Sequence, residues 1–115
     1  MLEAEFKKRH IAKWKKLGIY EKVYCIESEE TEPGFPDVIA HGGTFDFFEF
    51  KVSDARGLIK FKKTQPSFYK RNPALGVIII ALDNRDGKVI MFPASALFEV
   101  DGMFEIDRKL EVQLP

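Results

Sequence analysis

Hydrophobic positions near the N-terminus recur every three or four residues, with lysine or arginine at most positions between them. This spacing is typical of one face of an α-helix that packs on a core. It predicts a helix over residues 2–17, which Gly18 ends. The predicted core face consists of Leu2, Phe6, His10, Trp14 and Leu17.

The hydrophobic segments that follow have the length of β-strands and are bounded by turn residues. They predict strands over 23–26, 36–40 and 44–52, with His41-Gly42-Gly43 as the turn between the last two. The polar segment 27–34 is predicted to be a loop.

A basic loop and a short helix come next. Residues 53–63 are predicted to form the loop, and Thr64 is expected to cap the helix. Pro66 suits the first helical turn, where a missing N–H costs little. The helix is expected to end before Asn72, because the residue before a proline avoids helical geometry.

The second half of the chain predicts two more strands. The segment "GVIIIAL", 76–82, has the composition of a strand buried on both faces, and 88–92 predicts its neighbour. Residues 93–98 suit a small helix, and 101–115 alternate only weakly. The order of helix, three strands, helix and two strands predicts an α/β fold with a central mixed β-sheet flanked by helices.

The strand 44–52 has two different faces, because alternate residues of a strand share a side. Phe45, Phe47, Glu49 and Lys51 share one face, which begins aromatic and ends charged. The two phenylalanines are expected to anchor the strand. If the glycine turn makes the preceding strand antiparallel to it, Asp37 and Glu49 converge.

Two carboxylates in one place repel each other unless a positive charge joins them. Mg²⁺ suits such a pair and keeps waters that can act as nucleophiles. Lys51 beside them would hold such a water or neutralise charge on a phosphate. The same residues also suit a surface Glu–Lys pair at a strand edge, which stabilises a protein little.

Charge is unevenly distributed along these 115 residues, although the net charge is zero. Residues 1–16 carry six basic and two acidic side chains, and residues 51–71 carry seven basic and one acidic. Partners respond to such local potential, so the two segments suit a polyanion, although solvated faces explain them equally well. The length predicts a single domain over 1–115.

The single cysteine, Cys25, excludes an internal disulfide and a cysteine-built zinc site. No apolar run approaches the ~20 residues of a membrane span, and the charged start is unlike a secretory signal. We expect a reduced, cytoplasmic protein of a bacterial cell or a phage-infected host, with no membrane partner.

Two short motifs, Pro36-Asp37 and Glu49-Phe50-Lys51, resemble the signature of the PD-(D/E)XK nuclease superfamily. The predicted order of elements is similar to the α-β-β-β-α-β, restriction-endonuclease-like core of that superfamily. Lys63-Thr64-Gln65-Pro66-Ser67-Phe68 resembles a helix start of Holliday-junction resolvases and the VRR-NUC branch, and 76–80 with 91–95 is similar to RecU-type resolvases. The resemblance covers about residues 3–98, without the long RecU extensions or the Val-Arg-Arg signature.

The resemblance implies a Mg²⁺-dependent endonuclease, in which Mn²⁺ is expected to substitute for Mg²⁺. The implied metal ligands are Asp37, Glu49, the Phe50 carbonyl and Glu3, with Glu5 as the alternative to Glu3. Lys51 would position the attacking water, and Gln65 would orient Lys51 or a metal-bound water. Hydrolysis in this superfamily leaves a 5′-phosphate.

The implied substrate is DNA, first of all branched DNA such as a four-way junction. A resolvase cuts two strands symmetrically, so this version implies a homodimer. The expected phosphate contacts are Arg56, Lys60, Lys62, Lys63, Lys7 and Lys8. The alternatives are a restriction-like or general repair nuclease of the same superfamily, and a non-catalytic DNA-binding module that keeps the fold.

Overall fold

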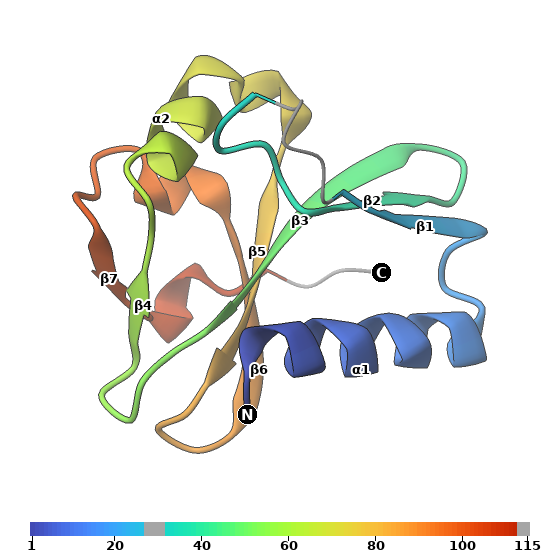
Figure 1. The fold of residues 1–115 in the computed structure, drawn as a ribbon, viewed down its shortest axis with the longest axis horizontal. Coiled ribbons are helices and arrows are strands. Elements are labelled where there is room, and N and C mark those ends of the chain that lie inside the picture. The colour runs from blue at the N-terminus through green and yellow to red at the C-terminus, as the bar shows by residue number, and fades with distance from the viewer. Residues whose placement is uncertain (27–31, 113–115) are drawn as a thin grey trace.

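A twisted five-stranded sheet forms the centre of the computed structural model, which describes residues 1–26 and 32–112 (Figure 1). Part of the predicted loop over 27–34 therefore lies outside the described residues. The helices are α1 (Glu3–Leu17) and α2 (Thr64–Arg71), with 3₁₀ turns η1 (Pro73–Leu75), η2 (Ala94–Leu97) and η3 (Arg108–Leu110). The strands are β1 (Lys22–Cys25), β2 (Val38–His41), β3 (Phe45–Val52), β4 (Leu58–Lys60), β5 (Ile78–Asp83), β6 (Lys88–Pro93) and β7 (Met103–Glu105).

The central sheet has the strand order β1-β2-β3-β5-β6. Its middle pair, β3 and β5, is parallel, and the other neighbouring strands are antiparallel. A parallel pair needs a long crossover, which β4 and α2 supply here. The predicted fold class, an α/β protein with a mixed sheet flanked by helices, is confirmed.

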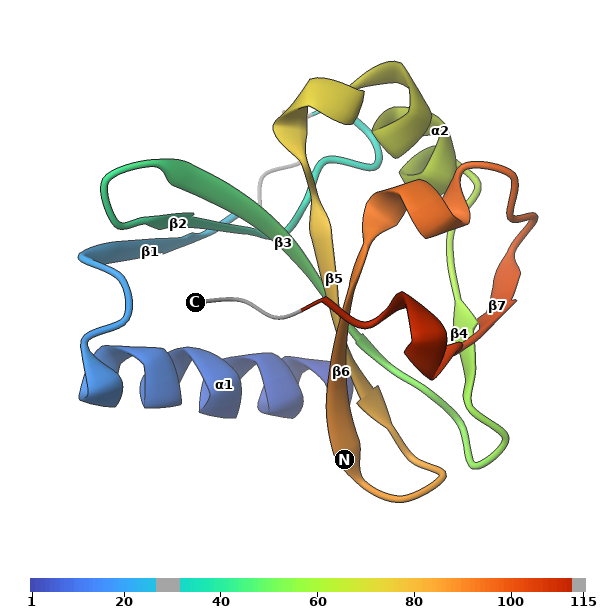
Figure 2. The same ribbon diagram turned by 180° about the vertical axis from the view of Figure 1, so that it is seen from behind.

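Helix α1 covers one face of the sheet (Figures 1 and 2). It packs there on Phe48 and Phe50 of β3, both fully buried. Leu2 and Leu17, predicted on the core face, are instead 77% and 60% exposed, because they lie at the helix ends. The buried side chains of α1 are Phe6, Ile11 and Trp14.

The opposite face carries α2, η2 and the β4–β7 pair (Figure 2). Ile79 and Ala81 of β5 belong to this second core, and Ile80 belongs to the α1 side. All three side chains are fully buried, as predicted for a strand covered on both faces. Within the described ranges, neither helix combines the length and the apolar character needed to span a membrane.

Three local predictions were wrong. Phe45 does not anchor β3, because the strand begins beyond the cores and leaves that side chain 60% exposed, with its ring centroid 4.6 Å from that of His41. His41 is the last residue of β2 rather than part of the turn. Thr64 is the first residue of α2, and Lys63 holds the N-cap position without a side-chain hydrogen bond to cap the helix.

The basic segment 53–63 was also predicted as a loop, but it contains β4. This strand pairs antiparallel with β7, 43 or more residues further along the chain, and forms a separate two-stranded sheet. Each strand has three residues, too few for a recognisable alternation. The pairing places Lys60, the last residue of β4, close to the start of α2.

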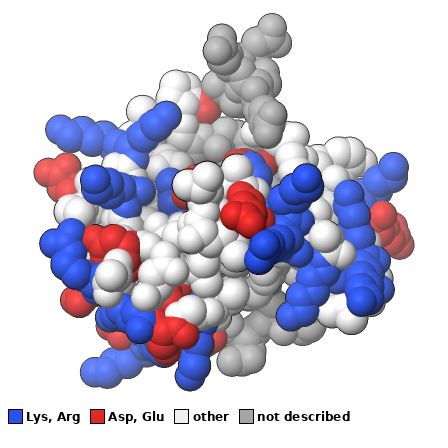
Figure 3. Space-filling view, turned by 60° about the horizontal axis from the view of Figure 1, so that its bottom comes forward, with Lys and Arg blue, Asp and Glu red and all other residues white. Residues whose placement is uncertain are grey.

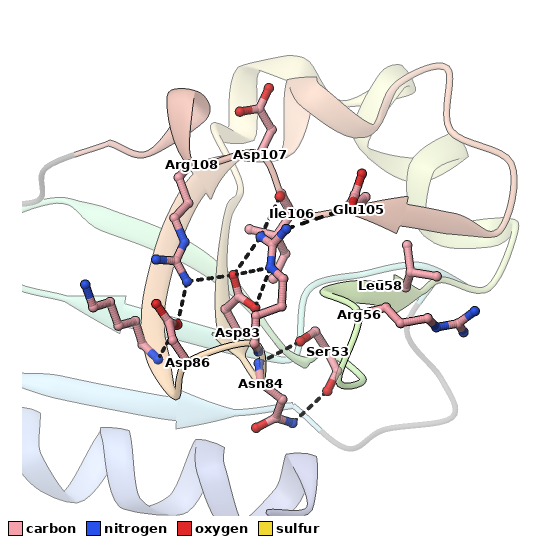
Figure 4. Close-up of polar contacts among 12 residues, drawn as sticks. Ser53, Arg56, Leu58, Asp83, Asn84, Asp86, Glu105, Ile106, Asp107 and Arg108 are labelled. Atoms are coloured by element: carbon pink, nitrogen blue, oxygen red, sulfur yellow. Dashed lines mark hydrogen bonds and ion pairs between the residues drawn. The ribbon is translucent and has the colours of Figure 1, made fainter.

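An ion cluster around Asp83 fixes the β5–β6 turn to the segments around β4 and β7 (Figure 4). Asp83 is fully buried and accepts hydrogen bonds from Arg85 at 2.7 Å and Arg108 at 2.9 Å. Arg85 also donates to the Ile106 carbonyl at 2.7 Å. Gly57 has a φ of +80°, and a Cβ there would lie 2.5 Å from Nε of Arg85, so the guanidinium packs directly on the backbone that leads into β4.

Candidate active site

Strand β3 continues past the start of β2, and the site lies where the two strands part. In the register Val38 pairs with Phe48, which puts Asp37, the residue before β2, opposite Glu49. From Glu49 to Val52 the ladder partners of β3 lie in β5. The β2 ladder does not extend along the other edge of β3 at these residues. The first turn of α1 and the segment before β2 can therefore approach this part of β3.

A cleft of about 610 Å³ occupies this position. Its walls come from the first turn of α1, the segment before β2, the end of β3 and the connection from β4 into α2. All five predicted catalytic residues line it, although they come from four separate segments of the chain. The lining residues are Glu3, Gly34, Phe35, Asp37, Glu49, Lys51, Lys60, Phe61, Lys62, Thr64 and Gln65.

Asp37 and Glu49 occupy a poorly hydrated part of the cleft, whereas Glu3 at the start of α1 is more exposed. Glu49 is 4% exposed, and burial together with the charge of Asp37 raises its pKa to about 8. Burial is also the main reason why the pKa values of Asp37 and Glu3 are raised, while Lys51 acts in the opposite direction on both. The site therefore concentrates negative charge that a cation would stabilise.

The two carboxylate oxygens of Asp37 differ. Oδ2 lies 3.4 Å from Nζ of Lys7. Oδ1 is buried and has no hydrogen-bond partner, a costly state for a charged oxygen. Burial raises the pKa of this carboxyl group, and the Lys7 ammonium and the nearby Phe50 N–H oppose that shift without outweighing it.

The Phe50 carbonyl also suits a ligand role. Extension of the β2–β3 register places Pro36 opposite Phe50. Proline has no N–H, so the register supplies no donor for the Phe50 carbonyl on this edge.

These donors fit Mg²⁺ in kind. No group of three or more histidine, cysteine, aspartate or glutamate side chains within the described residues is arranged to hold a metal. Mg²⁺ commonly uses one or two carboxylates and keeps several waters, so a full protein cage is not required. Asp37, Glu49 and the Phe50 carbonyl match that requirement, and Glu3 faces the same cleft.

Lys51 is held on the other side of the carboxylates. Its ammonium donates to Oε1 of Gln65 at 3.1 Å and lies 4.9 Å from the ring centroid of Phe61. The same Gln65 oxygen accepts from the Lys62 N–H at 3.2 Å, which fixes the amide. The geometry thus brings together the residues expected to orient one another, Lys51 and Gln65.

The two candidate glutamates of α1 differ in their position relative to the cleft. Glu3 lines the cleft, and the charges of Lys51, Asp37 and Lys7 influence its pKa. Glu5 is about half exposed and pairs with Arg9 at 2.9 Å, one turn along the helix. Glu3 is therefore the α1 carboxylate that faces the cleft.

The expected phosphate contacts have different positions. Lys60 and Lys62 line the cleft, whereas Lys8 and Lys63 are exposed outside its lining. Arg56 is exposed and pairs with Asp54 at 2.8 Å. Lys7, also expected as a phosphate contact, is 18% exposed and reaches Asp37 inside the site.

Basic side chains also gather outside the cleft. Figure 3 shows the face that points down in Figure 1, with lysine and arginine on the α1 side and again on the opposite side. Surface with fewer charges separates the two groups. On the side away from α1, acidic side chains lie among the basic ones.

Sequence reasoning missed two features near the cleft. Tyr69 follows Gln65 by one turn of α2, is 1% exposed, and its buried hydroxyl lacks a hydrogen-bond partner. Burial and the charge of Glu49 raise its pKa. The four-residue spacing of Gln65 and Tyr69 was the available signal that the two side chains share a helix face.

The second missed feature is Gly34. It has a φ of +92°, and a Cβ there would lie 2.1 Å from the Thr64 carbonyl oxygen. Glycine therefore lets this wall of the cleft pack against α2.

Comparison with known proteins finds similarity at the level of the fold. No protein-family model matches the sequence, and no curated protein matches it either. Among solved structures, this fold is similar to that of Hjc of Archaeoglobus fulgidus, a Holliday junction resolvase from an archaeal hyperthermophile. The TM-score is 0.64 at 16% sequence identity, over 94% of this chain and 90% of that one. The chain therefore has the restriction-endonuclease-like fold of this resolvase.

Proposed function

We propose that this protein is a Mg²⁺-dependent, structure-specific DNA endonuclease of the PD-(D/E)XK superfamily that resolves Holliday junctions. The central observation is the cleft in which Asp37, Glu49 and Lys51 meet, with Lys51 hydrogen-bonded to Gln65 at 3.1 Å. The fold shared with an archaeal resolvase supports the same proposal. The RecU-type or VRR-NUC branch stays a prediction from the sequence.

In this proposal the carboxylates bind the metal. Asp37 and Glu49 would hold Mg²⁺ with the Phe50 carbonyl, and Glu3 would act directly or through water. Bound Mg²⁺ supplies a Lewis acid and lowers the pKa of a coordinated water. The partnerless Oδ1 of Asp37 and the raised pKa of Glu49 support this assignment, because both carboxylates gain from a nearby cation.

Lys51 would position the attacking water near the scissile phosphate and stabilise the negative charge that develops there. Gln65 would hold the ammonium in that direction, since the observed hydrogen bond links the end of β3 to the first turn of α2. The burial of Lys51, which is 9% exposed, supports a fixed position for its charge.

The DNA backbone would follow the basic side chains. Lys60 and Lys62 stand at the cleft, where they would contact the phosphates that flank the scissile bond. Lys8, Lys63 and Arg56 would extend this contact over the surface, and affinity would fall as the salt concentration rises. Two symmetrical cuts in a junction require two copies of the site, so we propose that the protein acts as a homodimer.

Cleavage assays distinguish this proposal from its alternatives. Labelled four-way junction and a linear duplex of the same sequence are incubated with Mg²⁺, and separately with Mn²⁺. Preferential junction cleavage supports a resolvase, whereas equal rates on both substrates indicate a restriction-like or general repair nuclease. Salt-dependent binding without cleavage in either metal indicates a non-catalytic DNA-binding module.

A further inference from the structure

Tyr69 of α2 carries a buried polar group that the proposed chemistry does not use. Its side chain is 1% exposed, and its hydroxyl has no hydrogen-bond partner. Such a hydroxyl destabilises a protein, because it has lost its hydrogen bonds to water. Across residues 1–26 and 32–112, the other buried side-chain nitrogen or oxygen in this state is Oδ1 of Asp37. Both atoms lie near the proposed metal site, because Asp37 lines the cleft and its charge acts on the Tyr69 hydroxyl.

The helix directs the Tyr69 hydroxyl towards the cleft. Long side chains of a helix lean towards its N-terminus, so Tyr69 leans over the turn that begins with Gln65, a residue of the cleft lining. Burial first, and then the charges of Glu49, Asp37 and Glu3, raise the pKa of this hydroxyl. The group therefore stays protonated and can donate a hydrogen bond to a carboxylate.

The sheet turns Glu49 towards the layer that contains Tyr69. Glu49 pairs with Ile79 of β5, and directly paired residues of neighbouring strands share a face of the sheet. Ile79 belongs to the core beneath α2, and so does Tyr69. Of the three carboxylates, Glu49 has the strongest influence on the Tyr69 hydroxyl. Glu49 is therefore the carboxylate that this hydroxyl reaches most readily.

A second cavity borders the Tyr69 ring. It measures about 250 Å³ and lies at the C-terminal end of α2, where Asn72 and Pro73 line it. The Tyr69 side chain leans in the opposite direction, towards the N-terminal end of the helix. We therefore assign the hydroxyl to the cleft rather than to this cavity.

We propose that Tyr69 is a positioning residue for metal binding, whose hydroxyl donates a hydrogen bond to the Glu49 carboxylate, directly or through one water, when Glu49 holds a divalent cation. The inference rests on the proposed function, because it takes Glu49 as a metal ligand. Carboxylates that bind a metal are commonly fixed by hydrogen bonds from outer groups, which raise metal affinity about 10–100-fold. Tyr69 acts through Glu49 and touches neither the metal nor the DNA.

Loss of the hydroxyl should affect the metal-free and metal-bound proteins differently. In the metal-free protein it removes a buried polar group without a partner, which should not lower stability. In the metal-bound protein it removes the hydrogen bond that holds Glu49. A tyrosine that only filled the core would leave metal affinity unchanged when its hydroxyl is removed.

Mn²⁺ binding tests the effect on the metal site without reference to activity. Electron paramagnetic resonance measures the Mn²⁺ affinity of the wild type, Tyr69→Phe and Tyr24→Phe, all without DNA. We expect Tyr69→Phe to bind Mn²⁺ about tenfold more weakly. Tyr24→Phe removes the same chemical group from an exposed position of β1 and should bind like the wild type.

Urea unfolding of the same proteins tests the effect on stability. Without metal, the unfolding midpoint of Tyr69→Phe should equal or exceed that of the wild type, which also shows that the variant is folded. Added Mn²⁺ should raise the midpoint of Tyr69→Phe less than that of the wild type, because the variant binds the metal more weakly.

The outcomes separate the role of Tyr69 from the proposed function. Wild-type Mn²⁺ affinity in Tyr69→Phe overturns that role and leaves the nuclease proposal standing. A lower midpoint without metal does the same, because it shows that the hydroxyl already has a partner. An equal loss of affinity in Tyr24→Phe also overturns the role, since the effect would not depend on position. A wild type that binds no Mn²⁺ contradicts the proposed function and this inference together.

Discussion

Lys51 of β3 donates a hydrogen bond of 3.1 Å to Gln65 of α2, and this bond joins the central sheet to the helix that carries the opposite wall of the cleft. The two residues lie fourteen positions apart in the sequence, with β4 between them. The hydrogen bond restricts the Lys51 side chain, which would otherwise adopt several rotamers. Its position beside Glu49 makes it the contact on which the proposed chemistry depends most.

Replacement of Gln65 by methionine removes this bond and keeps a side chain of similar length. A hydrogen bond to a charged group contributes about 1.5–3 kcal/mol, so single-turnover cleavage should slow about tenfold to a hundredfold. Junction affinity should change little, since the lysine charge remains. Ser67→Ala, at an exposed position of the same helix, should cleave at the wild-type rate. A wild-type rate for Gln65→Met would remove Gln65 from the mechanism.

The raised pKa of Glu49 predicts that the stability of the protein falls as the pH rises. Its pKa is raised to about 8 in the folded protein, from 4.5 ordinarily. Between these values the folded state binds a proton that the unfolded state has lost, so the free energy of unfolding should fall as pH rises, by at most about 1.4 kcal/mol per unit. Urea unfolding of the metal-free protein from pH 5 to 8 measures this slope.

Glu49→Gln isolates that contribution. The variant should be more stable than the wild type near pH 8, and its stability should depend less on pH between 5 and 8. His10, whose pKa is lowered chiefly by burial, acts in the opposite direction but is present in both proteins. Parallel curves for the two proteins would show that Glu49 is ionised throughout this range.

The position of Gly34 leaves no room for a side chain, so we expect a substitution there to destabilise the protein. Alanine at this position would combine a φ of +92° with a Cβ 2.1 Å from the Thr64 carbonyl oxygen. Because backbone must move to relieve the overlap, Gly34→Ala should lower the free energy of unfolding by about 2 kcal/mol or more. Gly43→Ala is a matched control, with a φ of +94° and open space around the new Cβ, and should cost about 1 kcal/mol. Chemical denaturation compares the two, and equal losses would mean that the contact with α2 contributes nothing.

The lowered pKa of Asp83 predicts that the protein loses stability in acid. Hydrogen bonds from Arg85 and Arg108 hold its pKa well below the usual value. The stability it contributes is therefore present above about pH 4 and is lost as pH falls toward the lowered pKa. Asp83→Asn should lower the free energy of unfolding at pH 7 by about 3 kcal/mol, because Arg85 and Arg108 lose their buried charged partner and keep only the more exposed Glu105 and Asp86. Exposed Asp101→Asn should stay within about 0.5 kcal/mol of the wild type, and a similarly small loss for Asp83→Asn would show that the cluster contributes little.

The sequence predicted the central sheet and the helices because their patterns are local. Ile79 and Ile80 lie in a continuous apolar run, and Phe6 and Trp14 repeat at helical spacing. Asp37 and Glu49 were expected to converge because one turn joins their strands, and the register places them opposite each other. A pattern that lies within two adjacent elements is visible before the structure is known.

Features that depend on distant segments were not visible. The β4–β7 pair joins two three-residue strands across more than forty residues, so neither strand has a recognisable local pattern. The alternation of side chains along the strand assigned Phe45 to one face of the sheet. It did not show that the hydrophobic cores end before this residue. The contact of Lys7 with Asp37 depends on where β2 begins relative to α1, which no local pattern records.

The central claim is that this cleft cuts branched DNA, and the direct measurement is cleavage of a labelled four-way junction in Mg²⁺ by the wild type and by Lys51→Ala. We predict that the wild type cuts the junction faster than a linear duplex of the same sequence, and that chelation of the metal abolishes cutting. Lys51→Ala should bind the junction and not cut it. Absence of cleavage by the wild type in both Mg²⁺ and Mn²⁺, or unchanged cleavage by Lys51→Ala, would contradict the claim.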